Sequence, residues 1–390
     1  MQPKHFMPLP SPEFYGPFTV NGSLDAAQRL FEKQILGSES LAIKDGKVFA
    51  GLNDGRIMRI INGKLELLTK IGGNGCHVGL KKVTSKDESA GLCGLPVGMR
   101  LDDAGDLVVA DLNKGLYRVS TTTGNVIPLV PISTVIDGKR LILPNDLTIS
   151  AKGDIYFTET STNWPLTKWG CHAGFLAFVE NAASGRILHY DPQTKKARTV
   201  VDSVHFPNGI QLSSKDEFLI FSQSNRFNIL KYHLRGLQKG QLEVLVDNLP
   251  GHPDNIRPSG KGNSHWVALF NPRLPGEGNL FQCTSSKPFV RRVVYSTLIF
   301  AQRVINELQV YLPFRIMDIL IYELDSLIWS SMGDKNYGLV FEMKEDGTIL
   351  RSLHSPKGRL NQITQVIESN DILYFSSVMN NYIGKFKLYK

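Results

Sequence analysis

The sequence predicts an all-β protein, a six-bladed β-propeller with a helical insertion near residues 287–315. Three observations support this fold. A short motif, a proline followed by a polar residue and an alternating apolar run, recurs along the chain. Each copy is followed by a turn signal and further strand-like runs, so that one unit holds four short strands. The copies lie roughly 45 to 65 residues apart, which suits a propeller blade with loop insertions.

The motif copies mark the start of each expected blade. In chain order they read PVGM at 96–99, PNDL at 144–147, PNGI at 207–210 and PDNI at 253–256, and GSESLAI at 37–43 precedes them as a divergent first copy with Glu39 at the polar position. A last unit has outer strands over 338–354 and an innermost strand near 362–368. We expect this order to close the ring by combining separate parts of the sequence in one blade. Residues 1–29 are interpreted as an N-terminal arm and residues 30–390 as the propeller.

Two insertions interrupt the repeat. Residues 161–185 form a long aromatic segment, which we expect to cover the mouth of the channel as a lid. Four aromatic side chains of the lid offer an apolar wall for a substrate, although core packing beneath a lid explains them equally well: Trp164, Trp169, Phe175 and Phe178. The second insertion, 287–315, has the apolar stripe of an amphipathic helix with arginines at its margins. Such a helix either packs on the propeller or makes peripheral contact with a membrane surface.

The composition limits the class of protein. Hydrophobic residues make up 42% and charged residues 21%, which is typical of a globular protein with a sizeable core. The formal net charge of +8 comes from scattered basic residues, a pattern that argues against a nucleic-acid surface. The longest apolar run, 296–314, is interrupted by Arg303 and Glu307 and is not expected to span a bilayer. The proline-rich N-terminus does not resemble a signal peptide.

The cysteines and one sequon bear on the compartment. Cys76 and Cys93 flank a polar loop, and a disulfide between them would imply an oxidising compartment. The alternative is that all four cysteines are free or buried thiols. Asn21-Gly22-Ser23 is a glycosylation sequon, which is weak evidence by itself.

The recurring polar residue predicts a metal site. The innermost strand of every blade lines the channel, so a residue at the start of several such strands must converge on the axis. Two carboxylates and three amides would meet there: Glu39, Asn145, Asn208, Asp254 and, adjacent to it, Asn255. Hard oxygen ligands of this kind favour Ca²⁺. A single Asn or Asp after proline more often begins a turn, and the metal is favoured because the pattern repeats.

At this point the sequence resembles a known family. The motif strands are similar to the metal-site strands of the calcium-dependent six-bladed propellers, which include paraoxonases, gluconolactonases and regucalcin. The runs GRILHYDPQTKKARTVVDSVHFPNGIQLS and NLPGHPDNIRPSGKGNSHWVA resemble the strictosidine synthase-like branch, and within it the adipocyte plasma membrane-associated proteins. The resemblance implies a fold of this type, metal ligands at the five positions named above, and a place in the secretory pathway or at a membrane.

The chain departs from the family at the positions for acid/base chemistry. Thr364 stands where strictosidine synthase has its catalytic glutamate, and Glu368 lies too far along the strand to replace it. The paraoxonase histidines align with Val97 and Asp111. Asp111 is a candidate base if burial raises its pKa, and a turn-capping role is its alternative. His252 is a second candidate base, with a hydrogen-bonded loop histidine as its alternative.

The resemblance and the ligand set together predict a calcium-dependent hydrolase of aryl esters or lactones, with the ion polarising the carbonyl. No GxSxG motif is present, which argues against a serine hydrolase. A non-catalytic propeller with structural calcium is the alternative, because both sets of family acid/base residues are missing. Strictosidine synthase-type condensation is the third candidate, and Thr364 argues against it.

Overall fold

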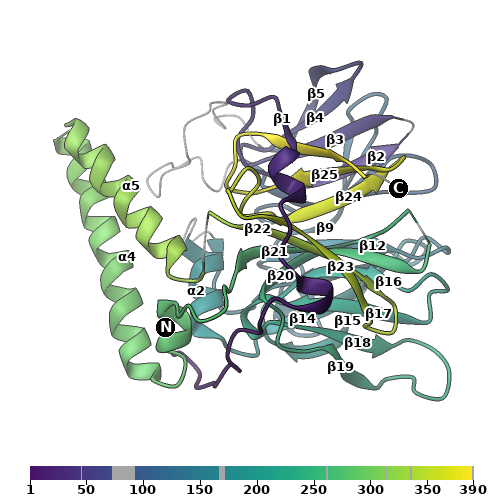
Figure 1. Ribbon diagram of the computed structural model, residues 1–390. Coiled ribbons are helices and arrows are strands. Elements are labelled where there is room, and N and C mark those ends of the chain that lie inside the picture. Colours follow the sequence, from purple (N-terminus) through teal and green to yellow (C-terminus); the bar gives the residue numbers. More distant parts are fainter. Residues whose placement is uncertain are drawn as a thin grey trace.

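The computed structural model describes residues 1–44, 46–72, 93–166, 172–260, 262–312, 314–333 and 336–388. Within these residues, six four-stranded antiparallel sheets surround a central axis, and the long helices stand on one side of the ring (Figure 1). The innermost strands contact one another in turn around the axis, and the last contacts the first. The predicted six-bladed β-propeller is confirmed.

The first four sheets follow the sequence from the innermost strand outwards. The first holds β2 (Ser38–Lys44), β3 (Lys47–Leu52), β4 (Arg56–Ile61) and β5 (Lys64–Lys70), and the second β6 (Pro96–Leu101), β7 (Leu107–Asp111), β8 (Gly115–Val119) and β9 (Val126–Pro131). The third holds β12 (Pro144–Ile149), β13 (Ile155–Glu159), β14 (Gly185–Asp191) and β15 (Lys196–Val204), and the fourth β16 (Pro207–Leu212), β17 (Phe218–Gln223), β18 (Asn228–His233) and β19 (Leu242–Val246). A small hairpin, β10 (Val135–Ile136) and β11 (Lys139–Arg140), joins the second blade to the third.

The fifth and sixth sheets correct the predicted ring closure. The fifth holds β20 (Gly251–Pro258), β21 (Ser264–Pro272), β22 (Gly338–Lys344) and β23 (Ile349–Ser355), and the sixth β24 (Gln365–Ser369), β25 (Ile372–Ser376), β26 (Ile383–Lys387) and β1 (Gln28–Leu30). The strands over 338–354 therefore complete the fifth blade. The helical insertion separates them from β21 in the sequence, which hid this pairing. The N-terminal strand closes the sixth blade by pairing Arg29 with Gly384, so the propeller begins within the predicted arm.

Hydrophobic side chains between neighbouring blades form the core. Val108 and Leu116 of the second blade pack in one cluster with Phe157 and Leu188 of the third, and all four are completely buried. On β7 and on β14 the members of this cluster are two residues apart, Val108 with Ala110 and Leu188 with Tyr190, as expected of residues that point to one face of a sheet. Because every blade is packed against its two neighbours, the inner strands are held in fixed register around the channel.

The helices lie at the end of the channel where the inner strands begin. Because neighbouring strands are antiparallel, the second strand of each blade ends there. The connection from β13 to β14 contains α2 (His172–Glu180), and that from β21 to β22 contains α3 (Leu280–Cys283), α4 (Pro288–Tyr311) and α5 (Arg315–Ser330). The predicted insertion 287–315 therefore covers only part of the helical segment. Pro313 follows the end of α4, and the apolar sequence beyond it forms a second helix that was not predicted.

The N-terminal arm connects the helices to the fifth blade. The backbone amide of Lys4 donates to the carbonyl oxygen of Glu180 in α2, and Arg291 of α4 donates to the carbonyl oxygen of Lys4. Further along, the Ser11 hydroxyl donates to the carbonyl oxygen of Arg273 at 2.6 Å. The arm then forms two short 3₁₀ helices, η1 (Gly16–Phe18) and η2 (Ser23–Ala26), which contact β23.

Candidate metal centre

Each proline motif coincides with an irregularity in an inner strand. Pro144 pairs with Glu159 and Leu147 with Phe157, so three residue steps on β12 oppose two on β13. The register shifts by one residue at the motif in β2, β6, β16 and β20 as well. A bulge of this kind takes residues out of regular pairing and re-aims their side chains. In β12 and β16 the motif therefore combines a proline at the strand start with polar residues that the bulge takes out of regular pairing.

The five predicted ligands are all buried at this end of the channel. The exposed fractions are 7% for Glu39, 8% for Asn145, 5% for Asn208, 6% for Asp254 and zero for Asn255. Within the described part of the chain, one side-chain oxygen of each of the last four residues has no hydrogen-bond partner. Leaving a buried polar atom unpaired costs about 1–3 kcal/mol, and four such oxygens fit a bound cation.

The two carboxylates of this set are electrostatically strained. The pKa of Glu39 is raised to about 8, by burial first and by repulsion from Asp146 second, while Arg257 acts in the opposite direction. The pKa of Asp254 lies well above its ordinary value because of burial first, and then because of repulsion by Glu39 and Asp146. A divalent cation between the carboxylates would remove this repulsion. Among the described residues, no three or more His, Cys, Asp or Glu side chains form a group that could hold a metal. The candidate set has two carboxylates, and its other three members are amides.

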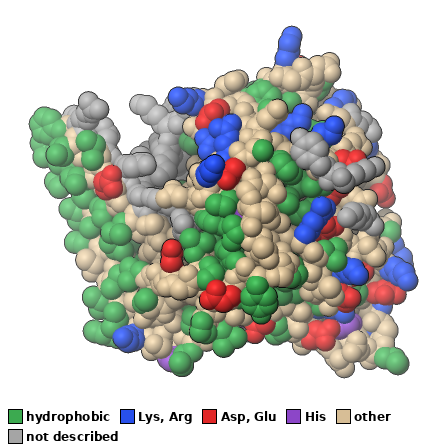
Figure 2. Space-filling view, in the orientation of Figure 1, with side chains coloured by type: hydrophobic (Ala, Val, Ile, Leu, Met, Phe, Trp, Pro, Cys, Tyr) green, Lys and Arg blue, Asp and Glu red, His purple; other side chains and the backbone are tan. Residues whose placement is uncertain are grey.

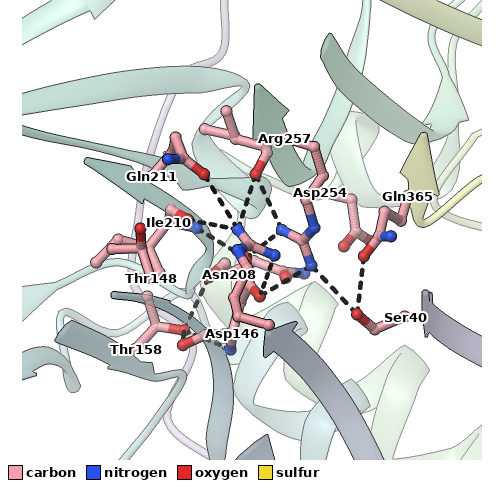
Figure 3. Close-up of polar contacts among 12 residues, drawn as sticks. Ser40, Asp146, Thr148, Thr158, Asn208, Ile210, Gln211, Asp254, Arg257 and Gln365 are labelled. Carbon is pink, nitrogen blue, oxygen red and sulfur yellow. Dashed lines mark hydrogen bonds and ion pairs between the residues drawn. The ribbon is translucent and has the colours of Figure 1, made fainter. Parts of the chain in front are cut away.

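A buried arginine lies beside the candidate ligands. Figure 3 shows that Arg257 faces Asp146, and its two terminal nitrogens lie 2.7 and 3.0 Å from the two carboxylate oxygens. Arg257 is 1% exposed and Asp146 is fully buried. The same guanidinium lies 3.3 Å from the hydroxyl of Ser40, which donates to Gln365 at 2.8 Å. This ion pair crosses the channel from the fifth blade to the third, and contacts the first and sixth through Ser40.

A second arginine reinforces the pair. Arg100 of β6 lies 3.6 Å from Asp146 and donates to the carbonyl oxygens of Ile210 and Ile256, each at 3.1 Å. Burial lowers the pKa of Arg100 to about 9, and repulsion by Arg257 contributes. Neither arginine was predicted as part of the site. One signal in the sequence could have indicated Arg257. It is a charged residue directly after Asn255 and Ile256, in an expected inner strand.

Thr364 occupies a structural position. Its hydroxyl donates to the carbonyl oxygen of Glu39 at 2.9 Å, and its own carbonyl oxygen accepts from the amide of Asn255 at 3.0 Å. The Ser376 hydroxyl also donates to the Glu39 carbonyl, at 2.7 Å. Glu368 accepts a hydrogen bond from the indole of Trp266, at the far end of β24. The sixth blade thus anchors the first ligand strand and offers no carboxyl group for a condensation reaction at position 364.

Asp111 has the geometry of its alternative role, a turn cap. One carboxylate oxygen accepts from the amide of Leu95 at 2.8 Å, and the other accepts from the amides of Asn113 and Lys114 at 2.9 Å. Burial raises the pKa of Asp111 to about 6, although these three hydrogen bonds act in the opposite direction. Val97, the other position of the paraoxonase pair, is completely buried. The carboxylate therefore holds a loop end, and the geometry does not support its use as a base.

His252 is likewise engaged within the protein. Its Nδ1 lies 2.9 Å from the carbonyl oxygen of Ser224, and its Nε2 lies 2.8 Å from that of Met332. The ring packs against Phe178 and Phe227, and burial lowers its pKa to about 4. Both ring nitrogens face acceptors, so neither is available to take a proton from a substrate. This geometry matches the buried, hydrogen-bonded alternative.

The predicted aromatic wall is part of the core between the lid and α4. Trp164 is 6% exposed and its indole donates to Glu180 at 2.7 Å. Phe175 packs edge-to-face on Tyr295 of α4 with ring centroids 5.5 Å apart. Trp169 lies outside the described residues. Trp164 and Phe175 therefore support the alternative interpretation, core packing beneath a lid.

Cys93 is disulfide-bonded. Its predicted partner Cys76 lies outside the described residues, so the pairing of these two cysteines stays a prediction. Cys283 is a free, exposed thiol. The sequon asparagine, Asn21, donates through its side-chain amide to the carbonyl oxygen of Ser352 at 3.0 Å.

Comparison with known proteins identifies the family. Residues 145–237 match the strictosidine synthase family model, and residues 16–60 match the N-terminal strictosidine synthase-like model. The adipocyte plasma membrane-associated protein of Bos taurus is 33% identical over 97% of this chain and 82% of the bovine protein. That of Danio rerio is 32% identical over 100% of this chain and 85% of the fish protein. The chain belongs to the adipocyte plasma membrane-associated protein family.

Solved structures of other proteins share the fold of this adipocyte plasma membrane-associated protein family member. A gluconolactonase of Xanthomonas campestris superposes with a TM-score of 0.58 at 14% identity, covering 98% of this chain and 97% of that protein. A calcium-binding protein, regucalcin, of Agrobacterium tumefaciens gives a TM-score of 0.54 at 13% identity, covering 92% and 93%. At these identities the likeness establishes a shared fold and leaves the chemistry to the residues of this chain.

Proposed function

We propose that this chain is a calcium-dependent hydrolase of aryl esters or lactones, and that five side chains at the bulges of the inner strands hold the ion: Glu39, Asn145, Asn208, Asp254 and Asn255. The observation that carries the proposal is the group of buried, unpartnered oxygens on four of these residues. The descriptions of two structural neighbours, a gluconolactonase and a calcium-binding protein, are consistent with it.

The chain's own residues divide the work of such a site. When bound, Ca²⁺ supplies a Lewis acid that polarises an ester carbonyl and stabilises the oxyanion that develops. Glu39 and Asp254 provide the negative charge that retains it. Thr364 and Ser376 fix the backbone of Glu39 through its carbonyl oxygen. The core between α2 and α4 covers this end of the propeller, which limits the access of bulk water.

One observation favours a second candidate function, a non-catalytic propeller with structural calcium. Asp111 and His252, the two candidate bases, have their proton-accepting atoms engaged by backbone groups. A hydrolase of this type would then require a base from another part of the channel, or would depend on the ion alone. A binding module would retain the same ligands and need no base.

The membrane association named in the relatives bears on where the chain acts. We propose a place in the secretory pathway or at a membrane, because the disulfide at Cys93 requires an oxidising compartment to persist. Among the residues that the structure describes, no helix has both the length and the hydropathy needed to cross a bilayer.

The test is hydrolysis of phenyl acetate and of an aliphatic lactone, each measured with calcium and with EDTA. The hydrolase proposal expects turnover that is lost in EDTA, restored by calcium, and lost in Asp254→Ala. The binding-module alternative expects calcium to raise the melting temperature without turnover of either substrate. Turnover that continues unchanged in EDTA would contradict the proposed role of the ion.

A further inference from the structure

On α4 several polar residues are buried against the protein, whereas many large apolar residues are exposed. The side that packs on the protein carries Arg291, Gln302 and Asn306, all buried, next to Tyr295 and Ile299. The exposed side carries a stripe of large apolar residues at helical spacing, Phe289, Val293, Phe300, Val304, Leu308 and Tyr311. A helix at the surface of a water-soluble domain normally has polar residues on its solvent face. The outward face of α4 is therefore suited to an apolar surrounding.

The apolar surface continues around the turn and along α5. Its residues on the turn and α5 are Leu312, Phe314, Ile316, Ile319, Leu320 and Leu327, between 41% and 61% exposed. These residues and the six on α4 are called the outer face. Figure 2 shows hydrophobic side chains along the edge that α4 and α5 form. A contiguous surface of twelve exposed, large apolar side chains is rare on monomers and marks an interaction site.

The turn between the helices is itself apolar. Tyr311 is 77% exposed and Phe314 is 61% exposed, and the sequence from Leu308 to Met317 contains a single residue that is charged at neutral pH, Arg315. Surface turns are normally built from Gly, Pro, Asn, Asp and Ser. Figure 1 shows that this end of the helix pair lies away from the strands of the propeller. An apolar turn at the free end of a hairpin would be buried if that end entered a lipid layer.

Basic side chains border the outer face at its other end. Lys287 and Arg292 are exposed near the start of α4, and Arg303 lies at the margin of the stripe. The exposed Lys4 is brought to the same end by the contact of the arm with Arg291. The sequence of the two helices also contains four acidic residues, Glu307 in α4 and Asp318, Glu323 and Asp325 in α5, so the basic margin is confined to the start of α4 and the arm. An apolar band with basic residues at its margin is the pattern of a helix that lies in the interface of an anionic membrane.

We propose that the outer face of the α4–α5 hairpin binds the surface of an anionic lipid bilayer. A second copy of the chain packing its helices side by side would cover the stripes but leave the apolar turn in water. A lipid surface covers the stripes and the turn and pairs with the basic margin. The hairpin stands at the end of the channel that holds the candidate ligands, so the bilayer would face that end. The inference does not depend on hydrolysis or on calcium.

The experiment is co-sedimentation of the 390-residue chain with vesicles of phosphatidylcholine, with and without phosphatidylserine. We expect binding to the anionic vesicles that weakens as salt is raised. The double variant Phe300→Asp/Phe314→Asp should lower the partition coefficient by about tenfold or more, because inserting even one Phe is worth over a factor of ten. The matched control Leu237→Asp/Val135→Asp changes two exposed apolar residues elsewhere and should bind as the wild type.

A second variant keeps the test informative if the first fails to fold. Lys287→Glu/Arg292→Glu changes only exposed charges, and it should weaken binding to phosphatidylserine vesicles. The proposal is overturned if the wild type binds neither kind of vesicle, or if both double variants bind as the wild type does. A wild-type dimer in light scattering that dissociates in Phe300→Asp/Phe314→Asp, without vesicle binding, would assign the outer face to a second copy.

Discussion

Arg257 and Asp146 form a bidentate ion pair in the interior of the channel, with nitrogen–oxygen distances of 2.7 and 3.0 Å. Asp146 directly follows the candidate ligand Asn145, and Arg257 lies two residues after Asn255. The positive charge of Arg257 therefore offsets part of the repulsion that Asp146, a third carboxylate, exerts on Glu39 and Asp254. It also joins the third and fifth blades across the axis.

Removing the arginine should leave Asp146 as an uncompensated buried charge. Arg257→Met is expected to lower the free energy of unfolding by about 3–5 kcal/mol, the range for breaking one side of a buried pair. We expect a loss near the lower end of this range, because Arg100 lies 3.6 Å from Asp146 and still offsets part of its charge. Urea denaturation measures it, with Arg257→Lys as the control that keeps the charge and loses the bidentate contact. Equal stability of Arg257→Met and the wild type would mean that the pair does not hold the channel together.

The metal-free protein should lose stability as the pH rises. The folded pKa of Glu39 is about 8 against an ordinary value of 4.5, so between these values the native state binds more protons than the unfolded state. The stabilisation from the protonated form is therefore present below about 4.5 and lost as the pH approaches 8. Asp254 shifts in the same direction.

Urea denaturation from pH 5 to pH 8, in EDTA and in calcium, measures this effect. We expect the free energy of unfolding to fall across the window in EDTA and to change less in calcium, which stabilises the ionised carboxylates. Glu39→Gln should reduce the slope in EDTA. If the free energy of unfolding falls equally with pH in EDTA and in calcium, the groups that titrate are not the groups that bind the ion.

His252 should contribute to stability and leave turnover intact. A neutral imidazole has one N–H, which donates to the carbonyl oxygen of either Ser224 or Met332. Replacing it by Phe leaves that carbonyl oxygen unpaired, at a cost of about 1–3 kcal/mol. Any ester hydrolysis should keep its pH–rate profile, because the ring nitrogens are not available to a substrate. A general base must be deprotonated, so it controls the acidic limb of the profile. Loss of that limb in His252→Phe, with the fold intact by circular dichroism, would identify His252 as the base.

The sequence predicted those parts of the molecule that repeat. Five inner strands could be located because the proline motif recurs, and the motif recurs because each strand has a bulge at the same point. The pairing of β21 with β22 was not predictable in this way, since the helices separate the two strands in sequence. Arg257 was missed because it occurs once, and a single arginine in a strand carries no signal of the partner it meets.

The surroundings of the two candidate bases could not be predicted for a related reason. Asp111 and His252 were selected from alignment with other propellers and from their position beside a motif. Their roles depend on which backbone groups surround them, and these groups come from loops and helices distant in the sequence, such as Met332 after α5. Periodicity specifies where a strand lies, whereas hydrogen-bond satisfaction depends on the whole fold.

The central claim is that the oxygens at the bulges bind calcium, and equilibrium dialysis with ⁴⁵Ca²⁺, paired with thermal melting, tests it most directly. The account predicts one calcium per chain and, at a free concentration about a hundred times the Kd, about 2.7 kcal/mol of added stability. Asp254→Ala should lose both effects, and Asp247→Ala, which removes an exposed carboxylate before the same inner strand, should keep both. A wild type that binds no calcium, or an Asp254→Ala variant that binds it as tightly as the wild type, would contradict the account.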